Sequence, residues 1–205
     1  MSLFITFEGG EGSGKSLQTR ALYRKLNRLA IPAVLIHEPG STVLGDKLTR
    51  LLKWARGTSI SPMTELMLFN ASRAQLLSEV VSPALKTGKI VICDRYTDST
   101  IVYQGYGRLI DIETIRKVNS LATGNLKPDL TVLLDISPEA GFARKTWQEP
   151  DRFEKEDRAF HRRVRAGYLK LAEEEPRRWL VVDAALPKEK IKQMIWQKVS
   201  CLIEK

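Results

Sequence analysis

The glycine-rich stretch of residues 9–16, GGEGSGKS, constrains this chain more than any other feature. It fits the pattern G-x-x-x-x-G-K-[ST], in which Gly9, Gly14, Lys15 and Ser16 occupy the four specified positions. Glycines let the backbone curl so that successive N–H groups point at anionic oxygens. The lysine reaches the outer phosphates of a nucleotide, and the serine hydroxyl is a ligand suited to Mg²⁺. The sequence therefore predicts a phosphate-binding loop.

The residues around this loop predict a strand before it and a helix after it. Residues 3–7 (LFITF) form a short apolar run suited to a buried strand, and residues 15–30 repeat apolar side chains at helical spacing. The apolar side of this helix is predicted to carry Leu17, Ala21, Leu22, Leu26 and Leu29. The helix also adds the positive end of its dipole to the anion site. This setting favours a phosphate-binding loop over an ordinary glycine-rich turn.

Four further apolar runs alternate with helical patterns along the chain. The runs are residues 33–36, 90–93, 130–134 and 179–182, and helices are predicted for residues 45–54, 63–81, 111–122, 138–147, 158–174 and 188–203. Pro83 is predicted to bend or end the second of these helices. Short continuous apolar strands between helices are typical of a parallel sheet covered on both faces. The predicted fold is α/β, a P-loop NTPase three-layer sandwich with a five-stranded parallel sheet in a single domain over residues 1–205.

Polar residues follow several of the predicted strands. Glu38, Asp94 with Arg95, and Asp135 come at or just beyond the ends of apolar runs. Ligands in such folds gather at the carboxyl ends of the strands, so all of these except Asp135 are interpreted as chemical groups. Asp94 is suited to hold the hydration shell of Mg²⁺ beside Ser16, and Arg95 to grip an acceptor phosphate. The alternative for Asp94 and Arg95 is an ion pair at the end of a strand.

Composition narrows the class of protein. The 205 residues are enough for one domain with a full core and short for two. The net charge of +9 would suit nucleic acid, but Lys and Arg are interleaved with Asp and Glu, and a cleft for two nucleotides also needs positive potential. The cysteines, Cys93 and Cys201, lack metal spacing and are interpreted as reduced thiols. Because no signal peptide or membrane-length run is present, the expected compartment is the cytoplasm.

The type of phosphate chemistry is limited by what the chain lacks. A GTPase would carry N-K-x-D and D-x-x-G motifs, and neither occurs in this sequence. A motor or nucleic-acid-dependent ATPase would end a strand in paired acids, but Asp94 precedes Arg95 and Asp135 precedes Ile136. An acid followed by an arginine suits phosphoryl transfer to a bound anion better than hydrolysis.

Beyond the loop, the chain resembles the bacterial thymidylate kinases, P-loop nucleoside monophosphate kinases that make dTDP from dTMP and ATP. The matching stretches occur in the family's order: FEGGEGSGKS, HEPGS, LMLFNASRAQL, CDRYTDSTIVYQGYGR, KPDLTVLLDISPE and DRFEKED. They cover most of residues 7–157. The resemblance implies ATP as phosphoryl donor, dTMP as acceptor, Mg²⁺, and a homodimer built through helices, with residues 63–81 as a candidate surface. It implies no nucleic-acid or membrane partner.

The resemblance also assigns roles to residues. The ATP phosphates are expected on Gly9, Gly10, Glu11, Gly12, Ser13, Gly14, Lys15 and Ser16. The acceptor is expected on Glu11, Glu38, Phe69, Arg73, Arg95, Ser99, Thr100, Tyr103 and Gln104. Phe69 and Arg73 are four residues apart on one helix face, so a ring and a guanidinium can meet one flat base. Phe69 matches the ring that stacks on thymine, Arg73 the group at the base edge, and Glu11 a carboxylate near the 3′-hydroxyl. Tyr103 would exclude a 2′-hydroxyl by its bulk.

The expected mechanism follows from charge. A phosphate monoester is already anionic at neutral pH, so the acceptor needs no general base. The difficulty is the repulsion between two polyanions, which cations must offset. Some family members carry a basic residue inside the loop and others supply arginines from a lid, and this loop has only Lys15. A lid at about residues 141–157 is therefore expected to bring Arg144 and Arg152 as catalytic groups. Arg152 is favoured, and Lys145 is interpreted as a solvated charge.

Three residues depart from the family's pattern: Leu17 replaces a threonine after the loop serine, His37 an arginine, and Ser41 a glycine.

Other functions remain open at this stage. A kinase for another nucleotide or for a deoxynucleoside is one, although a neutral 5′-hydroxyl would require a base. A basic nucleic-acid-binding ATPase and a nucleotide-binding pseudoenzyme are others, although the presence of Lys15 and Arg95 argues against the last.

Overall fold

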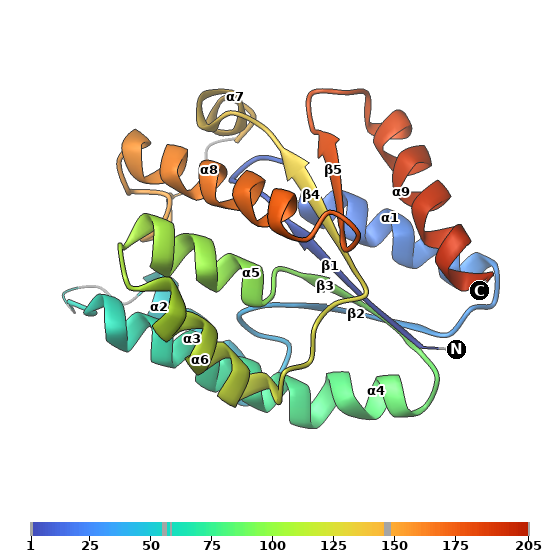
Figure 1. The fold of residues 1–205 in the computed structure, drawn as a ribbon, viewed down its shortest axis with the longest axis horizontal. Helices are drawn as coiled ribbons and strands as arrows, with labels where there is room; N and C mark the ends of the chain where they lie inside the picture. The colour runs from blue at the N-terminus through green and yellow to red at the C-terminus, as the bar shows by residue number, and fades with distance from the viewer. Residues whose placement is uncertain (1, 55–56, 58, 146–148, 205) are drawn as a thin grey trace.

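Five parallel strands form one sheet in the order β2-β3-β1-β4-β5 in the computed structural model of the chain (Figure 1). The structure describes residues 2–54, 57, 59–145 and 149–204. The strands are β1 (Leu3–Glu8), β2 (Ala33–His37), β3 (Ile90–Asp94), β4 (Leu130–Asp135) and β5 (Trp179–Asp183). Each begins at the predicted residue and runs one residue further, because a polar residue at its end still pairs with a neighbouring strand or continues the extended backbone. The predicted five-stranded parallel sheet is confirmed.

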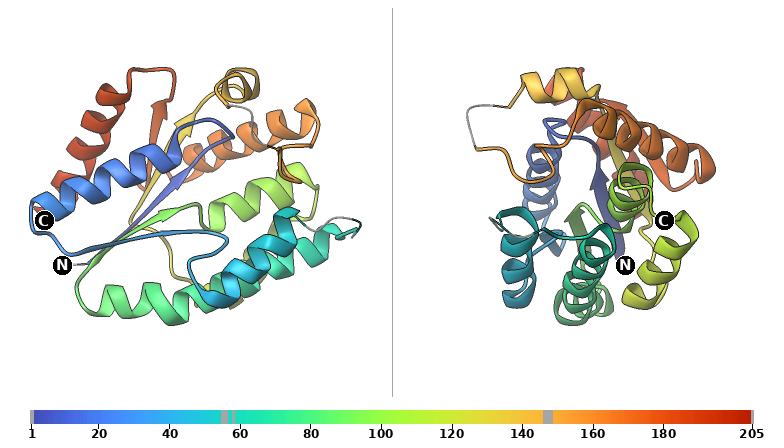
Figure 2. Two further views of the ribbon diagram at one scale, coloured as in Figure 1. Left: turned by 180° about the vertical axis from the view of Figure 1, so that it is seen from behind. Right: turned by 90° about the vertical axis from the view of Figure 1, so that its left-hand side faces the viewer.

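Helices cover both faces of this sheet (Figures 1 and 2). They are α1 (Lys15–Arg28), α2 (Val43–Trp54), α3 (Pro62–Leu76), α4 (Ser82–Lys86), α5 (Thr97–Thr100), α6 (Ile112–Thr123), α7 (Pro138–Ala143), α8 (Arg158–Glu174) and α9 (Lys188–Ile203), with π-helical segments η1 (Leu77–Val81) and η2 (Ile101–Gly107). Successive side chains of a strand point to opposite faces. Ile5 of β1 therefore packs with Leu26 of α1 and Ile195 of α9, whereas Phe4 packs with Leu76 and Val81.

The central position of β1 sets where a ligand can bind. Phe7 pairs with Asp94 of β3 on one side, and Glu8 pairs with Leu133 of β4 on the other. The chain crosses from β3 to β4 over β1, so the connections that follow β1 and β3 leave the carboxyl edge of the sheet beside each other. This is the place where parallel sheets of this class bind ligands.

The helix predicted for residues 63–81 is longer than expected, and Pro83 does not end it. Pro62 opens α3 after Ser61, whose hydroxyl accepts the N–H of Thr64. The helical backbone then continues through η1 and α4 to Lys86. A proline ring clashes with the carbonyl one α-turn before it, and the wider π-turn of η1 gives that ring room.

Residues 97–107 form a helical segment, α5 and η2, where the sequence indicated only connecting chain. Thr100, Ile101 and Val102 are β-branched and Gly105 and Gly107 follow, so local helix propensity is low. Tertiary packing decides the conformation instead: η2 lies against α8 and buries most of its residues. The segment presents its inner face to the cleft above the sheet.

Two further predictions about helices were wrong. Leu17 and Leu29 of the first helix are 42% and 50% exposed, because Leu17 lies about 140° around the helix from the buried Leu22 and because α1 ends before Leu29. The helix predicted for residues 138–147 ends at Ala143, and residues 146 and 147 of that prediction lie outside the described residues.

Two smaller observations bear on the expectations from composition. Both cysteines are free thiols, and Cys93 is buried while Cys201 is exposed. Within the described ranges, no helix has the length and apolar character needed to span a membrane.

Candidate active site

The phosphate-binding loop lies at the carboxyl end of β1 and contacts α7. Gly12 has φ 67°, and a Cβ at this position would lie 1.9 Å from the carbonyl oxygen of Gly141. Only glycine fits this close approach, which joins the loop to the segment that begins at α7. Lys15 Nζ donates to the carbonyl oxygens of Gly9 (3.0 Å) and Gly10 (2.9 Å). Burial and then the charge of Arg95 lower the pKa of Lys15 to about 8.

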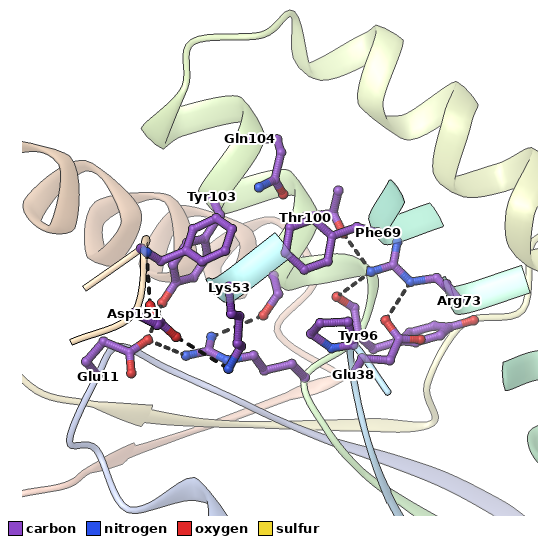
Figure 3. A pocket seen from close by; sticks show the side chains of 14 residues that line it. Glu11, Glu38, Lys53, Phe69, Arg73, Tyr96, Thr100, Tyr103, Gln104 and Asp151 are labelled. Atoms are coloured by element: carbon purple, nitrogen blue, oxygen red, sulfur yellow. Dashed lines mark hydrogen bonds and ion pairs between the residues drawn. The ribbon is translucent and has the colours of Figure 1, made fainter. Parts of the chain in front are cut away.

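Two cavities meet at this edge of the sheet. The loop cavity is lined by residues 11–16, Thr19, Arg20, residues 35–38, Lys53, Asp94 and Arg95. The deep cavity is lined by Glu11, Glu38, Pro39, Lys53, Phe69, Arg73, Arg95, Tyr96, Ser99, Thr100, Tyr103, Gln104, Asp151 and Phe153 (Figure 3). Each residue predicted to bind the acceptor lines the deep cavity, although those residues come from four separate parts of the chain.

Asp94 and Arg95 have different partners, so they do not form the ion pair that was the alternative interpretation. Ser16 Oγ donates to Asp94 Oδ2 over 2.7 Å. Arg95 has φ 72°, a backbone conformation that is uncommon for residues other than glycine. This conformation turns its guanidinium away from Asp94 and toward the deep cavity, which it lines. Arg95 Nη2 donates to Glu11 Oε1 over 2.9 Å. Burial would raise the pKa of Glu11, but Arg95, Lys15 and Lys145 outweigh it and lower that pKa to about 2.

Arg73 is held in one orientation by a complete set of hydrogen bonds. Its side chain is 1% exposed, and Nε donates to Glu38 Oε2 over 2.8 Å. The remaining N–H groups donate to Asn70, Asn119, the carbonyl oxygen of Tyr96 and the hydroxyl of Thr100. The other oxygen of Glu38, Oε1, is buried and has no hydrogen-bond partner within the described chain. Burial raises the pKa of Glu38 in spite of Arg73.

Glu8 forms a buried support for Arg95 that the sequence interpretation missed. It is the last residue of β1, and its carboxylate accepts the N–H of Tyr96 and the hydroxyls of Ser99 (2.6 Å) and Tyr168 (2.8 Å). Ser99 and Tyr168 in turn accept from Arg95 Nη1. Burial, followed by the charge of Asp98, raises the pKa of Glu8 from 4.5 to about 7. The position of Glu8, an acid at the end of an apolar strand and next to the loop, could have indicated this role from the sequence.

The basic residues of the predicted lid point in different directions. Arg144 Nη1 donates to the carbonyl oxygen of Ala184, and Arg152 lies with Nη2 2.7 Å from Glu65 Oε2. Neither side chain lines either cavity. Lys145 Nζ instead lies 3.9 Å from Glu11 Oε2 and pairs with Glu154. The interpretation of Lys145 as a solvated charge was wrong, because its side chain is partly buried and its amine lies between these two carboxylates.

Comparisons with known proteins agree with this geometry. A family model described as thymidylate kinase matches residues 7–195. The chain belongs to the thymidylate kinase family. It is 57% identical over 203 residues to a thymidylate kinase of Dehalococcoides mccartyi, covering 99% of this chain and 98% of that protein. It is 45% identical over 195 residues to one of Symbiobacterium thermophilum, with 95% and 91% covered. The crystal structure of thymidylate kinase from Ehrlichia chaffeensis superposes with a TM-score of 0.74 at 37% identity, over 88% of this chain and 92% of that one.

Two of the three departures from the thymidylate kinase pattern contact each other. Ser41 Oγ accepts the backbone N–H of His37 over 2.9 Å and lies 3.0 Å from Nδ1 of its ring. Ser41 has φ 63°, which explains why glycine is usual there. The side chain of His37 is therefore engaged with its own turn. Asp135, which was not assigned to chemistry, forms a two-bond ion pair with Arg165.

Replacing Glu8 by Gln should change how stability depends on pH. The folded pKa of Glu8 lies near 7 and its ordinary value is 4.5, so the folded state binds more protons between these values. This contribution to the free energy of unfolding therefore falls as pH rises from about 4.5 to 7. Glu8→Gln has no group that titrates there, so its free energy of unfolding lacks this fall. Relative to the wild type, its free energy of unfolding should therefore rise by up to about 3 kcal/mol between pH 5 and pH 8.

Urea unfolding at several pH values measures this difference. Glu113→Gln, at a carboxylate that is 75% exposed, is the matched control and should follow the wild type at every pH. A difference between Glu8→Gln and the wild type that stays constant with pH would show that Glu8 does not titrate in this range.

Proposed function

We propose that this member of the thymidylate kinase family transfers the γ-phosphoryl group of ATP to dTMP, giving dTDP on the route to dTTP. The enzyme is a phosphotransferase acting on a nucleoside monophosphate, as its family membership establishes. The observation that carries the proposal is the meeting of the two cavities at Glu11 and Arg95. A donor on the loop and an acceptor in the deep cavity would bring their phosphates together at that point.

On the donor side, the loop residues Gly9, Gly10, Glu11, Gly12, Ser13, Gly14, Lys15 and Ser16 are proposed to hold the ATP phosphates. Lys15 donates to two loop carbonyls in this structure and would exchange them for phosphate oxygens. Because the pKa of Lys15 is lowered to about 8, part of its amine is neutral at the upper end of the physiological pH range. A bound phosphate would raise this pKa and keep the amine protonated. Backbone N–H groups and the N-terminus of α1 add to the attraction.

Ser16 and Asp94 fit a site for Mg²⁺. Their hydroxyl and carboxylate oxygens lie 2.7 Å apart at the edge of the loop cavity, and hard cations prefer oxygen ligands of these kinds. Ser16 would bind the ion directly and Asp94 through water. When bound with ATP, Mg²⁺ would offset the negative charge of the phosphates during transfer.

On the acceptor side, the deep cavity is proposed to hold dTMP with its base against the ring of Phe69, which packs on Phe153 with ring centroids 5.7 Å apart. Arg73 uses all five N–H groups within the protein, so contact with the base edge would require an exchange of one bond. The longest is that to the carbonyl oxygen of Tyr96 at 3.3 Å. Ser99, Thr100 and Gln104 would contact the base or its surroundings. Tyr103 donates to Glu11, and its ring is proposed to exclude a 2′-hydroxyl by its bulk.

The reaction then requires positioning and charge rather than a base. A phosphate oxygen of dTMP attacks the γ-phosphorus of ATP, the bond to the bridging oxygen breaks, and ADP leaves with that electron pair. Arg95 would hold the attacking phosphate, and Lys15 would hold the transferred group. Arg144 and Arg152 stay proposed catalytic residues, which need a movement of the lid to reach the reaction. Lys145 is added to them because it already contacts Glu11.

We also propose that residues 1–205 form a single domain with a lid at about residues 141–157, in a cytoplasmic enzyme with no nucleic-acid partner. A homodimer is proposed because exposed apolar side chains gather on α2 and α3, which pack side by side. These side chains are Val43, Leu44, Leu51, Trp54, Met63 and Met67. A second copy of the same face would cover them.

The homodimer predicts a particle of twice the 23.2 kDa chain mass in light scattering after gel filtration. Met67→Glu, in the proposed interface, should reduce this mass to that of one chain, because it buries a charge in an apolar contact. Leu121→Glu, at a side chain that is 87% exposed on α6, is the control and should leave the mass unchanged. A wild-type particle of single-chain mass would contradict the proposal.

The substrate assignment predicts a strong preference for dTMP in a coupled assay of ADP release. The panel is dTMP, dUMP, dCMP, dGMP, AMP and thymidine, each with ATP and Mg²⁺. Thymidine should give no turnover because its neutral 5′-hydroxyl has no base to activate it. Equal rates for all monophosphates would reject dTMP specificity and leave a general nucleoside monophosphate kinase.

The lid assignment predicts a loss of turnover when one of its proposed catalytic residues is replaced. Lys145→Met and Arg152→Ala should each lower kcat by roughly 10- to 100-fold with little change in dTMP binding, since lost charge stabilisation acts in the transition state. Lys155→Met, an exposed lysine of the same segment, is the control. Turnover close to the wild type in Arg152→Ala would remove Arg152 from the catalytic residues. The same result for Arg144→Ala would remove Arg144, and for Lys145→Met it would remove Lys145.

A further inference from the structure

Four side chains line both cavities: Glu11, Glu38, Lys53 and Arg95. Three of them are held by short ion pairs, since Arg95 binds Glu11 over 2.9 Å and Arg73 binds Glu38 over 2.8 Å. The fourth, Lys53, comes from the last turn of α2 and was assigned no role from the sequence. Its Nζ lies 3.5 Å from Asp151 Oδ2, and its side chain is 36% exposed.

The backbone of Lys53 is anchored, whereas its amine makes a long and partly exposed contact. Arg152 donates its backbone N–H to the carbonyl oxygen of Lys53 and its Nε to that of Leu52. These bonds satisfy carbonyl groups that the end of a helix leaves open. Leu52 itself is fully buried. Figure 3 shows the side chain of Lys53 extending from this anchored turn toward Asp151 and Glu11, into the space where the two cavities join.

The charges of the other side chains at this junction do not balance the charge of an acceptor phosphate, so a further cation is needed there. A phosphate monoester brings a charge of about −1.5 to −2 at neutral pH. Arg95 and Glu11 together contribute a charge near zero, and Arg73 with Glu38 does the same, so those pairs alone do not neutralise the acceptor. The contact of Lys53 with Asp151 is long and partly exposed, and pairs of that kind contribute little stability. A phosphate dianion is a stronger partner for the amine.

Asp151 does not depend on Lys53 for its structural role. Its Oδ1 accepts the backbone N–H groups of Phe153 (2.9 Å) and Glu154 (3.0 Å), so it closes its own turn. The contact of Lys53 is with the other oxygen, Oδ2. Asp151 therefore suits a temporary partner that holds the amine at the junction until an anion arrives.

From these observations we infer that Lys53 leaves Asp151 and binds the 5′-phosphate of the acceptor nucleotide, beside Arg95. This inference deepens the proposed function and depends on it. Lys53 is then a substrate-binding residue of the reaction, supplied by α2 rather than by the loop or the lid. The contact is specific for the phosphate, since Lys53 lines both cavities whereas Phe69, the proposed base-stacking residue, lines only the deep one.

The test compares the binding of dTMP with that of thymidine, which has the same base and sugar and no phosphate. Lys53→Met should weaken dTMP binding by roughly 10- to 100-fold in titration calorimetry, the loss expected for a charged hydrogen bond, and leave thymidine binding unchanged. Lys53→Arg should restore part of the affinity. Lys47→Met, an exposed lysine earlier on α2, is the matched control and should bind both ligands as the wild type does.

A double variant separates the contact from simple repulsion by Asp151. Asp151→Asn alone should bind dTMP at least as tightly as the wild type, and Lys53→Met with Asp151→Asn should remain weak. Recovery of dTMP binding in the double variant would overturn the inference, because repulsion by the uncovered carboxylate would then explain the loss. Equal weakening of dTMP and thymidine, or no change in Lys53→Met, would also overturn it. Failure of the wild type to bind or phosphorylate dTMP would instead reject the proposed function.

Discussion

The ion pair between Arg95 and Glu11 is the interaction on which the arrangement of the site depends. It joins the residue after β3 to the phosphate-binding loop over 2.9 Å, and it therefore ties the donor side of the cleft to the acceptor side. The pair stays charged because the cations around Glu11 lower its pKa to about 2. A partly buried arginine without such a partner would carry a desolvation cost that the loop does not otherwise offset. The guanidinium of Arg95 is therefore held in one orientation at the junction of the two cavities.

Behind this pair lies a second, buried layer of polar groups. Glu8, Ser99 and Tyr168 hold Arg95 from below, and they come from β1, α5 and α8. The cost of burying Glu8 appears as its raised pKa. Such a network orients a cation that a surface ion pair would leave mobile, because both terminal nitrogens of Arg95 donate to acceptors that are themselves held in place. The positive φ of Arg95 contributes to this orientation, because it directs the side chain toward the cavity instead of toward Asp94.

Much of the fold was predictable because apolar runs and helical periodicity are local signals. All five strands begin at the predicted residues, and the motif of residues 9–16 placed Lys15 and Ser16 on one loop. The prediction failed where packing overrides local preference. Residues 97–107 are helical because they fill space against α8, and the helix before Pro83 continues because a π-turn accommodates the ring. Neither effect can be read from propensity alone.

The sequence by itself determined which chemical groups this protein has and, through the strand ends, on which edge of the sheet most of them lie. Motif spacing is a property of the sequence alone, so Gly9 through Ser16, Asp94 and Arg95 could be predicted to act on phosphate before any contact was seen. Only the tertiary structure decided which charges meet. Glu11 pairs with Arg95, Lys145 contacts the loop while Arg152 turns to Glu65, and Lys53 reaches the junction from α2. These pairings join residues that lie far apart in the sequence, such as Lys145 and Glu11, and their geometry depends on packed helices whose final turns no local pattern specifies.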